Sequence, residues 1–221
     1  LGKKYKVEYI IEDGSSDLGT FAKKAEKLIL KDKVTIVFGG WSSETRKALL
    51  PIFESSDSLL YYPAPYEGQE CSKNIFYSGA TPNQQVIPAN NYMFQYSDAA
   101  GKPFFLIGLD NIFNRKINEI TKEQIKVLGG NIKSENFIPF NNKKVNIASK
   151  IKKEMPDGGV IINNLIGDLN ISFFKSIQSA GITPQNNYYV MSFNITEKEI
   201  EEIGTNYLNN HYVAMNYMMS I

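Results

Sequence analysis

Short apolar runs alternate along the chain with longer stretches in which apolar residues recur at the spacing of an amphipathic helix. The runs that predict strands are residues 6–11, 35–38, 59–62, 104–107, 132–138, 160–162, 188–191 and 212–215. The helical stretches between them are residues 18–29, 48–53, 83–96, 113–128, 145–155, 169–177 and 197–202. Because alternating strands and helices are typical of βαβ units, we predict an α/β fold with parallel sheets.

The same pattern gives several local expectations. Ser16 or Asp17 should cap the first helix, and Pro88 should kink its helix or reset the start. Residues 35–38 show little polar alternation, which predicts a parallel strand covered on both faces by helices. The turn-rich residues 78–82 are a candidate linker between two lobes.

Composition narrows the classes of function. The chain has 221 residues and a formal net charge of +1, which gives no electrostatic reason to expect nucleic acid or an acidic membrane as a partner. One cysteine and one histidine make an intrachain disulfide impossible and a metal site of such ligands improbable, so no cofactor is expected. No apolar run approaches the roughly 20 residues of a membrane-spanning helix.

Candidate binding residues follow the strand predicted over residues 35–38. After two glycines come Trp41, Ser42 and Ser43, at the start of a helical pattern. A helix N-terminus offers N–H groups to a carbonyl oxygen, and a serine hydroxyl can accept from an amide N–H. Trp41 could form a wall over a flat ligand. The simpler interpretations are a helix N-cap at Ser42 or Ser43 and a core tryptophan.

A second candidate group follows the strand predicted over residues 59–62. Tyr62 would form another wall of the pocket, and the prolines on both sides of Ala64 predict a rigid, extended turn. In open α/β sheets, ligands bind at the carboxyl ends of the strands. The alternative for Tyr62 is core packing with a satisfied hydroxyl.

Three strand ends in the later half give further candidates, namely Asn111, Leu165 and Asn194. Asn111 could hydrogen-bond an amide or serve only as a turn residue. Near the other two, Asp168 and Thr196 could act as helix caps and not as binding residues.

Cys71 invites an enzymatic interpretation because Glu67, Glu70 and Lys73 are close in sequence. A nucleophile needs a base within hydrogen-bond reach, and closeness in sequence does not supply that geometry. A lone cysteine is more often a small buried apolar residue. We therefore expect no catalytic residues.

Long segments of the chain resemble the substrate-binding proteins of urea and short-chain amide ABC transporters and the related amide-sensing regulators. The segments that carry the resemblance are IEDGSSD and TFAKKAEKLI, FGGWSSETRKALLPIFE and YYPAPYEGQECSKNIFYSGATPNQQ. Weaker similarity continues through GLDNIFNRK, NLIGDLNISFFK, VMSFNITEKEIEEIG and HYVAMNY.

The resemblance implies a type I periplasmic-binding-protein fold, with two Rossmann-like lobes around a cleft. The implied lobes are residues 1–77 and 78–213, and residues 214–221 would begin a return toward the first lobe. Family members start one strand and one helix earlier and continue further, so the chain is expected to be truncated at both ends. The absent first strand would lie at the centre of the first sheet.

The family's amide pocket uses positions that match Trp41, Ser43 and Tyr62. Some amide sensors have threonine at the position of Ala64, and family members often have tyrosine at that of Asn111. Both differences leave the exact ligand open. The run around Glu67 to Cys71 resembles the urea branch more closely.

The resemblance therefore implies capture of urea or a short aliphatic amide, a small uncharged ligand, in an interlobe cleft for ABC import. The implied partner is a transporter permease and the implied location is periplasmic or extracellular. A ligand-sensing domain of a receptor or regulator, cytoplasmic in the latter case, is the alternative. An amidohydrolase is a remote one.

Overall fold

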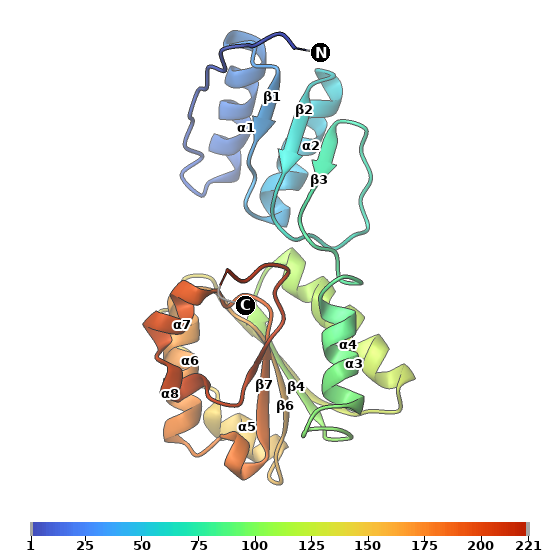
Figure 1. Ribbon diagram of the computed structural model, residues 1–221, viewed down its shortest axis with the longest axis vertical. Coiled ribbons are helices and arrows are strands. Elements are labelled where there is room, and N and C mark those ends of the chain that lie inside the picture. Colours follow the sequence, from blue (N-terminus) through green and yellow to red (C-terminus); the bar gives the residue numbers. More distant parts are fainter. Residues whose placement is uncertain (1, 220–221) are drawn as a thin grey trace. The chain divides into compact units, whose positions relative to one another are not determined.

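The computed structural model describes residues 2–219 (Figure 1). The strands are β1 (Ile36–Phe38), β2 (Leu59–Tyr62), β3 (Ile75–Tyr77), β4 (Phe104–Leu109), β5 (Ile132–Ile138), β6 (Gly159–Asn164), β7 (Tyr188–Ser192) and β8 (Tyr212–Val213). The α-helices are α1 (Leu18–Glu26), α2 (Ser43–Ser55), α3 (Val86–Gln95), α4 (Ile112–Val127), α5 (Ala148–Glu154), α6 (Asp168–Ser179), α7 (Glu197–Ile203) and α8 (Thr205–Leu208). Short π- and 3-10 helices cover Lys27–Lys31 and Pro184–Asn186.

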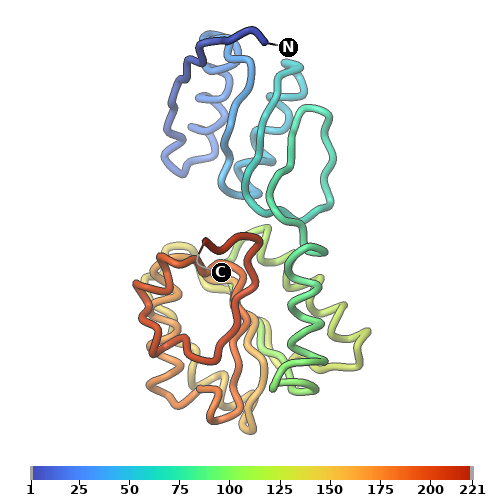
Figure 2. Tube along the Cα trace, viewed as in Figure 1, coloured from blue at the N-terminus to red at the C-terminus, as the bar shows by residue number. Residues whose placement is uncertain are grey.

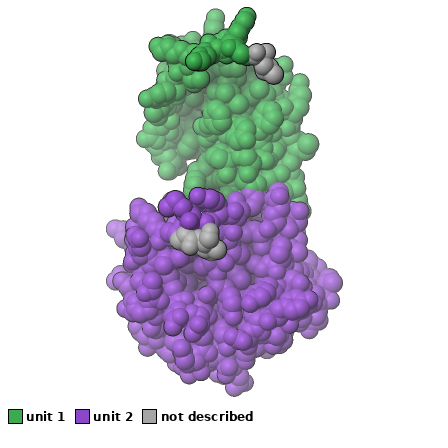
Figure 3. All heavy atoms as spheres, viewed as in Figure 1, with its two compact units in different colours: residues 1–79 green, residues 80–221 purple. Residues whose placement is uncertain are grey.

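The described strands form two separate parallel sheets. One has the order β1-β2-β3 and the other has the order β5-β4-β6-β7-β8. The chain divides into two compact units, residues 1–79 and residues 80–221 (Figure 3). The predicted α/β class with parallel sheets is confirmed. The expected return of residues 214–221 toward the first lobe stays a prediction, and its last two residues lie outside the described ones.

The second unit is a sheet with helices on both faces (Figure 1). Alternate residues of β4 face opposite ways: Phe105 and Ile107 pack with α5, α6 and α7, whereas Phe104 and Leu106 pack with α3 and α4. Every residue of β4, β6 and β7 is buried, which explains why their sequences are almost continuously apolar.

The sheet of the first unit has helices on one face only within the described residues. Phe53 of α2 packs with Leu60 and Tyr62 of β2 in the core between the sheet and helices α1 and α2. On the other face Phe38 is 69% exposed and Phe76 is 50% exposed, and the ring of Tyr61 is tilted against Phe38 and stacked on Phe76. The expectation that residues 35–38 are covered on both faces is therefore wrong. An apolar run shows that a strand can be buried, but it does not show which faces find a partner.

The strand predicted over residues 6–11 is also wrong. The segment carries no strand pairing and runs as an extended stretch past α1 (Figure 2). The next residue, Glu12, pairs with Lys24 of α1 at 2.5 Å and with Lys27, just after that helix, at 2.6 Å. These hydrogen bonds, that of Lys24 first, lower the pKa of Glu12 to about 2. A strand requires a neighbour for its ladder, and alternation of side chains alone does not supply one.

Asp17 caps α1 by accepting from the backbone N–H of Thr20 at 2.7 Å, as predicted. Helix α3 begins at Val86, and Pro88 therefore lies in its first turn, where a missing N–H costs no helical hydrogen bond. The helix therefore starts at Val86 and not at residue 83, which is the second of the two effects expected of Pro88. The sequence patterns missed β3 and α8, which have only three and four residues.

Candidate functional site

The end of β1 leads directly into helix α2 through two glycines. Gly40 has φ of 81°, and a Cβ there would lie 3.2 Å from the ring of Tyr62. Both the left-handed backbone and the close ring favour glycine at this position. The next residue, Trp41, is 76% exposed, so the interpretation of a packed core tryptophan is wrong.

Ser42 and Ser43 have different roles at the start of α2. Ser42 is the N-cap, and its Oγ accepts from the backbone N–H of Thr45 at 3.1 Å. Ser43 is buried, and its Oγ accepts from Nη1 of Arg46 at 3.3 Å. The predicted N-cap is confirmed. Ser43 instead contacts Arg46, which was not among the predicted site residues.

Tyr62 and Ala64, at the end of β2, are both buried. The guanidinium carbon of Arg46 lies 4.9 Å from the centre of the Tyr62 ring. Among residues 2–219 the Tyr62 hydroxyl makes no hydrogen bond of standard geometry. Burial is the largest effect on its pKa and raises it, although Arg46 and Ser43 lie near enough to favour the ionised form. The ring packs in the core as the simpler interpretation holds, but no partner in standard geometry satisfies the hydroxyl. The backbone of Gly79 packs directly against this turn: a Cβ at Gly79 would lie 1.9 Å from the Ala64 carbonyl oxygen, so a larger residue would not fit.

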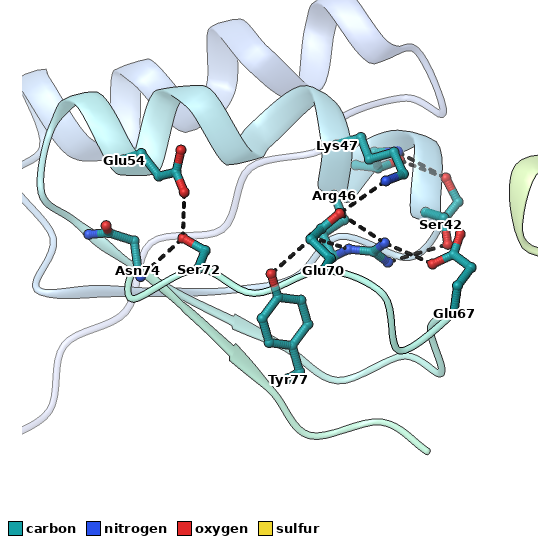
Figure 4. Close-up of polar contacts among 11 residues, drawn as sticks. Ser42, Arg46, Lys47, Glu54, Glu67, Glu70, Ser72, Asn74 and Tyr77 are labelled. Atoms are coloured by element: carbon teal, nitrogen blue, oxygen red, sulfur yellow. Dashed lines mark hydrogen bonds and ion pairs between the residues drawn. The ribbon is translucent and has the colours of Figure 1, made fainter. Parts of the chain in front are cut away.

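A charge cluster lies at the start of α2, with three largely buried members and an exposed lysine, Lys47 (Figure 4). Arg46 has no exposed surface; its Nε donates to Glu70 at 2.7 Å and its Nη2 donates to Glu67 at 2.9 Å. Glu70 also accepts from Lys47 Nζ at 3.1 Å and from the Tyr77 hydroxyl at 2.9 Å. We call Arg46, Lys47, Glu67 and Glu70 the charge cluster. It ties the start of α2 to the loop after β2.

The charge cluster is electrically balanced, with two cationic and two acidic side chains. Burial alone would lower the pKa of Arg46, but its hydrogen bonds with Glu70 and Glu67 outweigh this and raise it. Burial alone would raise the pKa of Glu70, yet the hydrogen bonds from Arg46 and Lys47 hold it below its ordinary value. The guanidinium is therefore committed to protein carboxylates.

One signal in the sequence points to Arg46. It shares the apolar face of α2 with Leu49 and Phe53, at the spacing i, i+3 and i+7. An arginine on a buried helix face needs a carboxylate partner. The pattern does not say which acidic residue supplies it.

Cys71 is an exposed free thiol, so the expectation of a buried apolar cysteine is wrong. The neighbouring residues that could form a catalytic group have other partners. Glu67 and Glu70 bind Arg46, and Lys73 pairs with Asp57 at 3.1 Å. Among residues 2–219 no group of three potential metal ligands occurs, and every helix is too short or too polar to span a bilayer.

In the second unit, each strand-end candidate lies between a strand and the helix that follows it. Asn111 caps α4 by accepting from the backbone N–H of Asn114 at 2.7 Å. Leu165 lies in the core with no exposed surface, and Asn194 is partly buried after β7. Thr196 forms a capping box at α7, as the alternative to a binding role there predicts.

Comparison with known proteins agrees with this architecture. The family model of the periplasmic binding protein domain matches residues 2–221. A solute-binding protein of a Rhodopseudomonas palustris ABC transporter, in complex with 4-hydroxybenzoate, is similar at 20% identity and a TM-score of 0.74, over 86% of this chain and 52% of that chain. An amino acid ABC transporter substrate-binding protein from Pseudomonas fluorescens is similar at 14% identity and a TM-score of 0.76, over 93% and 55%.

A leucine binding protein from Thermotoga maritima is 19% identical with a TM-score of 0.74, over 93% of this chain and 57% of that one. The chain thus spans about half the length of these solved structures. At such identities the structural likeness establishes the fold, while the family model covers almost the whole sequence. This chain belongs to the periplasmic binding protein family.

Proposed function

We propose that this chain is part of an extracytoplasmic solute-binding protein that captures urea or a short aliphatic amide for an ABC importer, with the transporter permease as its partner. The observation that carries the proposal is the balance of the charge cluster. Arg46 is already paired with Glu67 and Glu70, so it offers no cation to an acidic ligand. An uncharged ligand suits a site of this kind.

The strand ends of the first unit supply the groups that an amide requires. The start of α2 directs N–H groups and partial positive charge outward, which suits a carbonyl oxygen. The exposed indole of Trp41 offers a flat surface to a planar molecule. The buried residues next to these groups are held in place. Arg46 of the charge cluster contacts Ser43 and Tyr62, and the backbone of Gly79 packs against Ala64.

In the second unit we propose contacts from Asn111, Leu165 and Asn194, all at carboxyl ends of strands or just beyond them. The two asparagines have side-chain amides that can donate to a carbonyl and accept from an N–H. Leu165 would contribute through its backbone carbonyl, which can accept a second hydrogen bond beside that from Asn170, because its side chain is part of the core and its N–H donates to Asn163. A bound amide would thus have its donors and acceptors matched by neutral protein groups.

A thermal-shift assay on the intact protein tests the proposal. At millimolar concentrations, urea, formamide or acetamide should raise the melting temperature and leucine should not. A ligand at 100 times its Kd adds about 2.7 kcal/mol of stability. Stabilisation by leucine alone would contradict the proposal, and ammonia release that Cys71→Ala abolishes would favour the amidohydrolase.

Trp41→Ala should weaken binding of the stabilising ligand about fivefold, because a stacking surface contributes on the order of 1 kcal/mol. The matched control is Phe140→Ala, which removes an aromatic ring of similar exposure from the second unit. The melting temperature without ligand should change little in either variant, since both rings are exposed. Equal ligand affinities of the two variants would show that Trp41 does not contact the ligand.

A further inference from the structure

Side-chain amides link the carboxyl ends of neighbouring strands in the second unit. Asn114 of α4 donates from Nδ2 to the carbonyl of Leu109 at the end of β4 and to the carbonyl of Asn164 at the end of β6, both at 3.2 Å. One buried amide therefore holds two adjacent strand ends together.

The next link joins β6 to β7. Nδ2 of Asn163 donates to Oγ of Ser192 at 3.0 Å and to Oδ1 of Asn170 at 2.8 Å. Its Oδ1 accepts from the backbone N–H of Leu165 at 3.0 Å, and Asn170 donates to the Leu165 carbonyl at 3.2 Å. Both backbone polar groups of Leu165 are thus held by buried side chains.

The third link joins β7 to β8. Nε2 of Gln85, the residue before α3, donates to the carbonyl of Phe193 at 3.1 Å and to that of Ala214 at 2.6 Å. We call Gln85, Asn114 and Asn163 the amide belt. Its members come from three separate parts of the chain, and together they connect the ends of β4, β6, β7 and β8.

The amide belt is tightly enclosed. Asn114 and Asn163 are at most 2% exposed, and Gln85 is 8% exposed. A Cβ at Gly108 would lie 3.1 Å from Cβ of Asn164 and 3.2 Å from Cβ of Asn114, so the side chains around the belt are closely packed. Removing a member of the belt would take hydrogen bonds away from buried polar groups.

We infer that the amide belt holds the strand-end loops in one conformation before ligand arrives, so that its members are positioning residues for binding. This inference rests on the proposed function, because the loops held are those of the proposed contacts. Asn111 accepts from the backbone N–H of Asn114, whose side chain is in the belt. The N–H of Leu165 donates to Asn163, and its carbonyl accepts from Asn170, a partner of Asn163. Asn194 follows Phe193, whose carbonyl accepts from Gln85. A site held rigid before binding loses less conformational entropy on binding.

Hydrogen exchange by mass spectrometry on the full chain, without ligand, tests the inference. Asn163→Leu should speed exchange in residues 164–170 and 193–196 about tenfold relative to the middle of β4, because about 1.4 kcal/mol of local stability is lost. Gln85→Met, which keeps the length of the side chain and loses the donor, is the milder second variant. It should affect residues 193–196 and 214–216.

Tyr188→Phe is the matched control. It removes a buried hydrogen bond, to the Met155 carbonyl at 2.7 Å, at the amino end of the same sheet. It should leave exchange at the strand-end loops and the affinity for acetamide unchanged, whereas Asn163→Leu and Gln85→Met should weaken that affinity. Unchanged loop exchange in both belt variants, or an equal increase throughout the sheet, would overturn the inference. Faster loop exchange in a protein whose wild type binds no amide would refute the proposed function and leave the loop-fixing role supported.

Discussion

Replacing Arg46 with alanine is expected to destabilise the first unit by about 3–5 kcal/mol, because the nearly buried Glu67 loses its cation and Glu70 keeps only the partly exposed Lys47 as its cation. The side chains of Glu67 and Glu70 are 8% and 10% exposed, so water screens them poorly. Loss of the guanidinium also frees the loop after β2 from the start of α2. The proposed site should therefore lose ligand affinity along with stability.

Hydrogen exchange measures this effect in peptides around each substituted residue, those of α2 and β2 for Arg46→Ala and those of α4 for Arg115→Ala. Arg115→Ala is the matched control, because the pair of Arg115 with Asp110 is 57% and 44% exposed. Exposed pairs contribute about 0–1 kcal/mol. Similar, small effects of both substitutions would show that the charge cluster does not hold the unit together.

Acidification should destabilise the second unit between pH 6.5 and about 4 through His211, the single histidine of the chain. Burial lowers the pKa of His211 to about 4. Its Nδ1 accepts from the backbone N–H of Val190 at 3.1 Å, and its ring lies 5.7 Å from that of Phe174. A proton on Nδ1 would remove this acceptor and place a charge in an apolar setting.

The sign of the effect follows from the depressed pKa. The unfolded chain takes up a proton near pH 6.5 and the folded chain does so only near pH 4, so stability is fully present above 6.5 and falls as the pH is lowered. Each pH unit in this window costs about 1.4 kcal/mol, and the whole window costs on the order of 3 kcal/mol.

Titration of the single histidine by NMR, together with thermal unfolding across this range, checks the prediction. His211→Gln keeps an acceptor near Val190 and removes the titration, so the histidine-dependent part of the pH dependence should disappear. A histidine that titrates near its ordinary pKa of 6.5 would disprove the account of its burial.

Local patterning was sufficient for the class of fold. The apolar runs that became β4, β6 and β7 are buried on both faces, and such runs identify strands of parallel sheets with little ambiguity. Residues 6–11 alternate and then become apolar, yet they form no strand, because pairing depends on a neighbour that the local sequence does not encode. The same limit explains β3, whose three residues are fixed by pairing with β2.

The site was predictable where a residue acts through the backbone next to it. The cap at Ser42 follows from its place before a helical pattern. Contacts over long separations gave no such signal: Arg46 meets Glu70 across 24 positions, and Gln85 meets Ala214 across 129. The charge cluster and the amide belt therefore could not be predicted from the sequence and are seen only in the folded chain.

Calorimetric titration of the intact protein with acetamide and with acetate tests the central claim most directly, because the two ligands have nearly the same size and shape and differ in charge. The balanced charge cluster predicts that acetamide binds and that acetate does not bind detectably at the same concentrations. Binding of acetate as tight as that of acetamide, or tighter, would contradict a site built for an uncharged nitrogen compound.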